Sequence, residues 1–99
     1  MKCTRTDLPE ELRLQIEGAL DALTVRDLRP LLDSVVAEKP KFVSVDLEAL
    51  TLIDSSGVGA IVSLFKRVKA DGGKVVVTKA SEQPLAVLKL LKLDKVLGL

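Results

Sequence analysis

The chain has 99 residues, of which 47% are hydrophobic and only 2% aromatic, so it forms one small domain with an aliphatic core. Its 15 Lys and Arg residues nearly balance 14 Asp and Glu residues, which gives no electrostatic reason to expect a nucleic-acid or acidic-membrane partner. With no histidine and one cysteine, the chain by itself excludes a Ser-His-Asp or Cys-His catalytic site, a histidine metal site and a thiolate zinc cluster.

We expect no targeting signal at the start of the chain. Residues 1–11 are polar and do not resemble a signal peptide, and no apolar run approaches the ~20 residues of a membrane span. A single cysteine cannot form an intramolecular disulfide, which favours a reducing compartment. We therefore expect a cytoplasmic protein with one domain over residues 1–99, no membrane insertion and a frayed segment over residues 1–10.

The first half of the chain predicts a strand followed by a helix. Hydrophobic and polar residues alternate over residues 12–17, which is typical of a half-buried strand, and Gly18 ends it. Thr24 suits the N-cap of a helix whose hydrophobic positions recur at helical spacing over residues 25–36. Pro30 lies beyond the first turn of that helix, so we expect a kink or a later helix start.

A second strand and a long helix follow. Residues 43–48 alternate like the first strand. One broad face of the next helix is expected to be buried, and its hydrophobic positions are Val58, Ile61, Val62, Phe65 and Val68. Gly72-Gly73 is a typical signal for the end of a helix.

The last third predicts one more strand and helix. Residues 74–78 contain three consecutive valines and indicate a short buried strand. Ser81 begins a helix with Pro84 in its first turn, and three of its residues are expected to face the core: Leu85, Leu88 and Leu91. The order β-α-β-α-β-α predicts an α/β layered fold in which right-handed crossovers join parallel strands.

One motif, Asp54-Ser55-Ser56-Gly57-Val58-Gly59, lies where a strand turns into a helix. Ser55 or Ser56 can cap the helix, while Gly57 and Gly59 would leave its first turn bare for close approach by another surface. A bulky change at Gly57 is then expected to obstruct a partner and spare the fold. A phosphate added here would meet the positive end of the helix dipole. An ordinary helix cap suits the same residues, and local chemistry alone does not decide between the two.

The motif and its surroundings closely resemble the anti-sigma-factor antagonists, which are stand-alone STAS domains. The segment from Gly18 to Thr24 is similar to that family's Gly-Glu-Leu-Asp-x-x-Ser/Thr, with Ala19 in place of the acidic residue. The resemblance runs from about Glu11 onward and includes the closing helix and short strand at residues 88–97. It implies an α/β STAS-type domain whose mixed, mostly parallel sheet of about four to five strands packs with about three to four helices.

The resemblance also implies a phosphorylation switch with no catalytic activity and no cofactor of its own. The acceptor is the serine that directly follows the Asp, which is Ser55 here, with Ser56 as the alternative. A serine kinase of the histidine-kinase-like ATPase superfamily binds the unmodified form and is released on phosphorylation, and a metal-dependent serine phosphatase reverses the reaction. The residues implied in partner binding are Asp21, Thr24, Asp54, Ser56, Gly57, Val58 and Gly59.

Two other functions compete with the switch. A nucleotide-binding enzyme is disfavoured because Gly72-Gly73-Lys74 lacks the Ser/Thr and glycine spacing of a phosphate loop, although a weak nucleotide effector site stays open. A constitutive STAS scaffold or transporter subunit is the stronger alternative, but it has no need of two hydroxyls after Asp54. A basic cluster over Lys89, Lys92 and Lys95 is interpreted as a solvated helix face.

Overall fold

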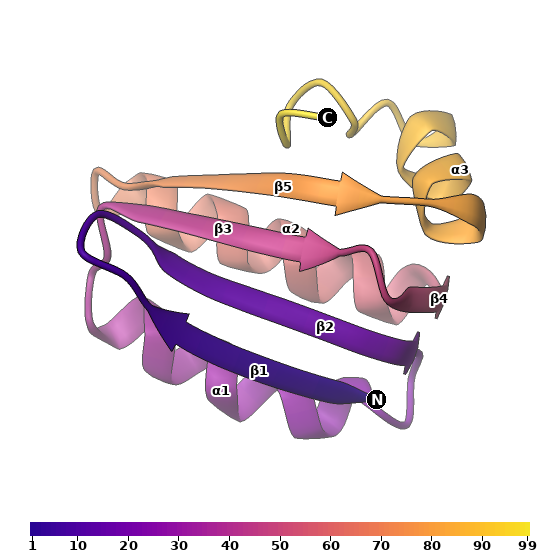
Figure 1. Ribbon diagram of the computed structural model, residues 1–99, viewed down its shortest axis with the longest axis horizontal. Helices are drawn as coiled ribbons and strands as arrows, with labels where there is room; N and C mark the ends of the chain where they lie inside the picture. The colour runs from indigo at the N-terminus through magenta and orange to yellow at the C-terminus, as the bar shows by residue number, and fades with distance from the viewer.

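The computed structural model describes residues 1–99 and contains five strands and three helices. It confirms the predicted α/β fold with a mixed sheet (Figure 1). In chain order the elements are β1 (Lys2–Asp7), β2 (Leu12–Leu20), α1 (Val25–Ala37), β3 (Phe42–Leu47), β4 (Leu50–Ile53), α2 (Ser55–Ala70), β5 (Lys74–Ala80) and α3 (Glu82–Leu90).

The sheet is organised around β2. Strands follow the order β1-β2-β3-β5, and β4 pairs with β2 off this path. The first part of β2, residues 12–15, pairs with β3, and residues 18–20 pair with β4, both in parallel. Because β2 continues past the end of β3, its last residues bring β4 and the start of α2 alongside the start of α1. This junction is where the predicted motif lies.

The expectation of a frayed N-terminus is wrong for β1. Its residues pair antiparallel with β2, from Lys2 opposite Glu17 to Asp7 opposite Leu12. The strand is polar because it is an edge strand with solvent on one side, so hydropathy gave no signal.

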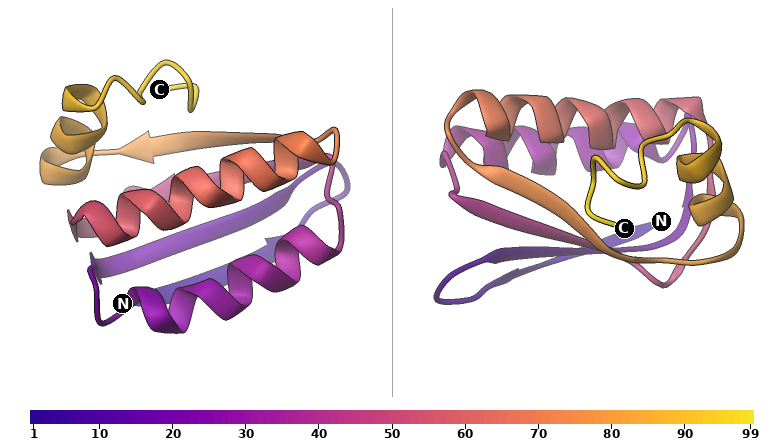
Figure 2. Two further views of the ribbon diagram at one scale, coloured as in Figure 1. Left: turned by 180° about the vertical axis from the view of Figure 1, so that it is seen from behind. Right: turned by 90° about the horizontal axis from the view of Figure 1, so that it is seen from above.

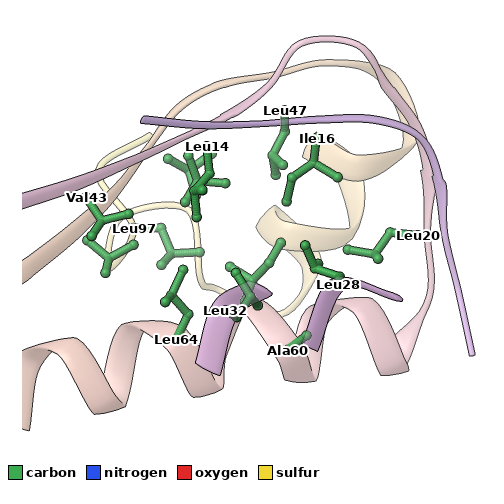
Figure 3. Packing of buried hydrophobic residues seen from close by; sticks show 14 of the residues in the cluster. Leu14, Ile16, Leu20, Leu28, Leu32, Val43, Leu47, Ala60, Leu64 and Leu97 are labelled. Carbon is green, nitrogen blue, oxygen red and sulfur yellow. The ribbon is translucent and has the colours of Figure 1, made fainter. Parts of the chain in front are cut away.

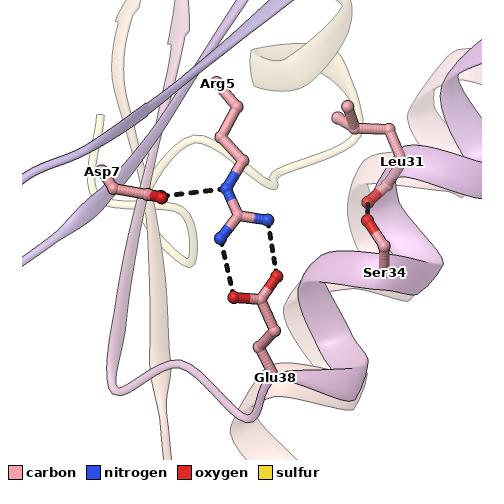
Figure 4. Close-up of polar contacts among 5 residues, drawn as sticks. All are labelled: Arg5, Asp7, Leu31, Ser34 and Glu38. Carbon is pink, nitrogen blue, oxygen red and sulfur yellow. Dashed lines mark hydrogen bonds and ion pairs between the residues drawn. The ribbon is translucent and has the colours of Figure 1, made fainter.

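One arginine ties β1 to the end of α1. The Arg5 guanidinium donates to both Glu38 carboxylate oxygens, at 2.6 and 2.8 Å, and also to Asp7 at 2.9 Å (Figure 4). Hydrogen bonds from Arg5 hold the pKa of Glu38 below its usual range, and the bond to Glu38 raises the pKa of Arg5. The two-pronged geometry fixes the orientation of the edge strand against the helix layer.

The two long helices cover one face of the sheet and bury the core. Figure 2 shows α1 and α2 side by side against the sheet, while α3 lies at one end. A single cluster of 22 buried hydrophobic residues fills the space between helices and sheet, in which Leu14 and Ile16 of β2 face Leu32 of α1 and Leu64 of α2 (Figure 3). The alternate residues of β2, Arg13, Gln15 and Glu17, are exposed, as the period-2 pattern predicted.

Both long helices correct details of the prediction. Helix α1 begins at Val25 and runs through Pro30 to Ala37, so a later start is wrong. In α2 the buried face includes Leu64, whereas Phe65 is only half-buried and packs at the margin of the core. The phase of the helix therefore differs slightly from the predicted one, because the apolar stripe is wide and its centre is ambiguous in sequence.

The glycine pair ends α2 as predicted. Gly72 has a φ of +86°, its N–H donates to Lys69 O at 3.0 Å, and Gly73 N–H donates to Val68 O at 2.9 Å. These two bonds form a Schellman motif. A Cβ at Gly73 would lie only 2.3 Å from Pro40 O, so the turn also needs glycine for close approach.

The segment after α3 lies along the free edge of β5 (Figure 1). Its Leu97 is buried, and the Val77 N–H of β5 donates to Leu97 O at 2.6 Å. The predicted core position Leu91 is instead half exposed, because α3 ends at Leu90 and the chain turns there. No helix combines the length and the apolar run needed to cross a bilayer.

Candidate functional site

Asp54 joins the start of α2 to the start of α1. It follows β4 in an extended conformation, and its Oδ1 accepts a hydrogen bond from Gly57 N–H at 3.1 Å, which makes Asp54 the N-cap of α2. Its second oxygen, Oδ2, accepts from Ala22 N–H at 3.1 Å in the loop between β2 and α1. One carboxylate thus fixes two loops that are 32 residues apart in sequence. Capping by Ser55 or Ser56, which the motif suggested, is wrong.

Because Asp54 supplies the cap, both serine hydroxyls are free. Ser55 is exposed and Ser56 is half-buried, and neither hydroxyl forms a hydrogen bond within the protein. The backbone N–H groups of the same two residues also lack protein partners, as expected for the first turn of a helix. These groups lie at the positive end of a 16-residue helix, where an anionic group is stabilised.

Among the three residues that follow the serines in the motif, Gly57, Val58 and Gly59, only Gly59 faces open space. A Cβ at Gly57 would lie 2.7 Å from Ile53 Cγ1 and 2.9 Å from Leu20 O, whereas one at Gly59 would meet nothing within 4 Å. Val58 is 8% exposed and belongs to the core. The expectation that Gly57 keeps the first turn bare is therefore wrong, because this glycine lets α2 pack closely on β2 and β4.

Asp21 and Thr24 lie on the loop that Asp54 holds. Asp21 Oδ1 accepts from the Leu23 and Thr24 N–H groups at 3.0 Å each, which closes the turn that precedes α1. These bonds, that of Thr24 first, lower the pKa of Asp21. Thr24 is the N-cap residue of α1, but its side chain makes no capping hydrogen bond. Thr24 Oγ1 accepts from Asp21 N–H and donates to Ala19 O, both at 2.9 Å. This last contact uses only the backbone of Ala19, so the missing acidic side chain does not disturb it.

Gln83 supports the site from α3, and sequence reasoning missed it. Its side-chain amide donates to Ile53 O and accepts from Ile53 N–H, both at 2.9 Å. The side-chain amide thereby pairs with the free edge of β4 as a neighbouring strand would. The paired residue, Ile53, directly precedes Asp54. The two residues are 30 positions apart, and no local pattern marks a glutamine for this contact.

An exposed leucine also escaped the sequence analysis. Leu23 is 73% exposed on the loop between β2 and α1, next to Ala22, whose N–H binds Asp54. The sequence did not indicate that Leu23 is exposed, because Leu23 directly precedes the apolar stripe of α1 and looks like part of it. A single exposed leucine is ordinary on a protein surface, so Leu23 by itself does not mark a binding surface.

Comparison with known proteins identifies the family of this chain. The family model described as "STAS domain" matches residues 4–99. The chain belongs to the STAS domain family. In this STAS domain, Asp54 and the two serines occupy the junction between β4 and α2, and Asp21 and Thr24 lie beside them.

Solved structures share the fold at low sequence identity. An anti-sigma factor antagonist from Mycobacterium paratuberculosis is 21% identical, with 98% of this chain and 82% of that chain covered and a TM-score of 0.85. Unphosphorylated SpoIIAA, an anti-sigma factor antagonist of Bacillus, is 19% identical, with 95% and 84% covered and a TM-score of 0.83. A sulfate transporter family protein from Wolinella succinogenes is 19% identical, with 94% and 75% covered and a TM-score of 0.75. At these identities the similarity shows the fold.

Proposed function

We propose that this STAS domain is a phosphorylation-controlled binding protein in the cytoplasm. Its unmodified form binds a serine kinase of the histidine-kinase-like ATPase superfamily, acting as an anti-sigma-factor antagonist, and a phosphate on Ser55 releases that partner. A metal-dependent serine phosphatase restores the binding form. The domain supplies the acceptor hydroxyl and no catalytic group or cofactor.

The observation that carries the proposal is the free hydroxyl of Ser55. It is exposed, and it makes no hydrogen bond that the fold needs, because Asp54 already caps α2. A phosphate would add about −1.5 to −2 charges close to the Asp54 carboxylate. The added charge lies at a helix N-terminus, so the helix tolerates it, while a partner surface that fits the neutral serine loses affinity.

Ser56 is the weaker candidate acceptor. It is half-buried, so a kinase has less access to its hydroxyl than to that of Ser55. The similarity to SpoIIAA supports a phosphorylation switch, since solved structures of that antagonist include an unphosphorylated and a phosphorylated form.

Site-resolved mass spectrometry with the purified kinase and ATP tests the assignment. Ser55→Ala should retain kinase binding and lose phosphorylation, whereas the matched variant Ser56→Ala should keep both. Ser55→Asp should weaken kinase binding without loss of cooperative unfolding, because it adds charge at the interface and not in the core. Phosphate found on Ser56 alone would reverse the assignment.

A constitutive scaffold or transporter subunit is the second candidate function. The structural similarity to a sulfate transporter family protein favours it, because that protein has the same fold over 94% of this chain. Purification of the tagged domain with its bound partners separates the two functions. Recovery of a kinase-like ATPase supports the switch, and recovery of a transporter subunit with no phosphate on either serine supports the scaffold.

A further inference from the structure

The segment after α3 combines exposed aliphatic side chains with unpaired lysines. Leu90 is 81% exposed, Leu91 51% and Val96 54%, although the rest of the aliphatic residues mostly fill the core. Three exposed lysines alternate with them in the same eight residues, and the set of six is called the basic rim: Lys89, Leu90, Leu91, Lys92, Lys95 and Val96.

The rim is held in place by buried neighbours. Leu88 and Leu97 are both fully buried, and Leu97 O accepts the hydrogen bond from the N–H of Val77 in β5. The intervening turns are closed by backbone bonds, including Leu97 N–H to Leu93 O at 3.0 Å. The exposed leucines are therefore presented by an anchored segment. Figure 1 and the left view of Figure 2 show this segment beyond β5, at the edge of the sheet.

The rim segment carries an excess of positive charge, with three lysines against Asp94, which lines a hollow together with Lys89 and Glu48. None of the three lysines takes part in an ion pair; the five ion pairs of the protein involve other residues. Asp94 is the only acidic residue between positions 89 and 99. Val96 also lines a hollow of about 350 Å³ with Lys69 and Lys74, which extends the positive charge toward α2 and β5. The near-neutral total charge conceals this local excess.

We infer that the basic rim binds the surface of an anionic membrane. Long lysine side chains interleaved with leucines can place their ammonium groups at lipid headgroups while the aliphatic groups enter the interface. The charge complementarity selects anionic lipids, since each lysine near such a surface strengthens binding roughly fivefold. The interaction is peripheral and needs no spanning helix. It is independent of Ser55 and adds a membrane location to the proposed switch.

Vesicle co-sedimentation tests this inference with phosphatidylglycerol–phosphatidylcholine vesicles and with phosphatidylcholine vesicles alone. The full chain should bind only the anionic vesicles and should be released at about 1 M salt, where the Debye length shrinks to ~3 Å. The triple change of Lys89, Lys92 and Lys95 to Ser should lower the partition coefficient on the order of 100-fold. Leu90→Ser should also weaken binding.

Matched variants distinguish vesicle binding by the rim from an effect of net charge and from non-specific hydrophobic binding. Replacing Lys2, Lys41 and Lys66 by Ser removes the same charge from exposed positions outside the rim. Leu23→Ser removes an equally exposed leucine from the other loop. Both controls should bind vesicles nearly as well as the unmodified chain, and Ser55→Ala should bind equally well.

Three outcomes would overturn the inference. The first is equal binding to vesicles with and without phosphatidylglycerol, or binding to neither. The second is an equal loss for the rim triple and the control triple, which would make the effect one of net charge. The third is a dimer in light scattering that Leu90→Ser dissociates, which would assign the rim to a second copy of the chain. Circular dichroism should show cooperative unfolding for every variant.

Discussion

The two glycines of the motif should respond in opposite ways to the addition of one methyl group. Gly57 and Gly59 lie two residues apart near the start of α2, and the sequence gives no reason to treat them differently. In the fold, Gly57 is buried against Leu20 and Ile53, whereas Gly59 faces open space. We therefore predict that Gly57→Ala destabilises the protein and Gly59→Ala stabilises it.

The magnitudes follow from two terms. Replacing glycine by alanine inside a helix gains about 0.5–1 kcal/mol, and this gain applies at both positions. At Gly57 the new Cβ would lie 2.7 Å from Ile53 Cγ1, 2.8 Å from Leu20 Cγ and 2.9 Å from the backbone Leu20 O. A carbonyl oxygen in the sheet cannot move aside as a side chain can, so overpacking costs roughly 1–3 kcal/mol. The difference between the two variants should therefore be about 1–3 kcal/mol.

Urea unfolding followed by circular dichroism measures this difference. With a slope of about 1 kcal/mol per molar urea, the midpoints of the two variants should differ by roughly 1–3 M. The slope itself should not change, since both variants keep the same buried surface. A midpoint for Gly57→Ala equal to or above that of Gly59→Ala would refute the close packing of α2 on β2 and β4.

Three further predictions concern the core, the support of β4 and the pH dependence. Leu64→Ala should lower the free energy of unfolding by about 2–5 kcal/mol, and Phe65→Ala by clearly less, because only Leu64 is fully buried; urea midpoints compare them. Gln83→Leu should speed amide hydrogen exchange in β4, since it removes both hydrogen bonds between the Gln83 side chain and the Ile53 backbone. Exchange as slow as in the unmodified protein would contradict this pairing. The Arg5–Glu38 pair should stabilise the fold at pH values above the unfolded-state pKa of Glu38. This stabilisation should be lost as the pH falls through the folded-state pKa of Glu38, which is the lower of the two. In Glu38→Gln, the free energy of unfolding should therefore fall less steeply on the acid side of its pH profile.

The N-terminal strand illustrates where hydrophobic periodicity fails. An edge strand such as β1 needs little apolar surface, because solvent covers one side and Arg5 ties it to α1 through hydrogen bonds. A polar sequence of this kind resembles a loose terminus until a partner strand is in place. Strand β4 is similar: three of its four residues, Leu50, Leu52 and Ile53, pair with the end of β2, which no local pattern indicates.

The sequence predicted the position of the site correctly, but the structure changed the roles of its residues. The acidic residue and two serines at a strand-to-helix turn identified the junction correctly, because local chemistry places such residues at helix starts. The assignment of the cap was wrong, since Asp54 binds Gly57 N–H and leaves the hydroxyls free. Which hydroxyl is accessible depends on the packing of the first turn, and that packing places Ser55 at the surface and half buries Ser56.

The sequence by itself determined the α/β class, the order of the main elements and the position of the Asp-Ser-Ser-Gly turn, because periodicity and helix signals act over a few residues. Only the tertiary structure decided that Gly57 faces the core, that Asp54 binds Ala22 and that Gln83 completes the edge of β4. Each of these contacts joins segments about 30 residues apart or depends on the rotation of a helix about its axis. Such contacts are set when the apolar faces of helices and sheet pack together, and the spacing of residues along the chain does not specify them.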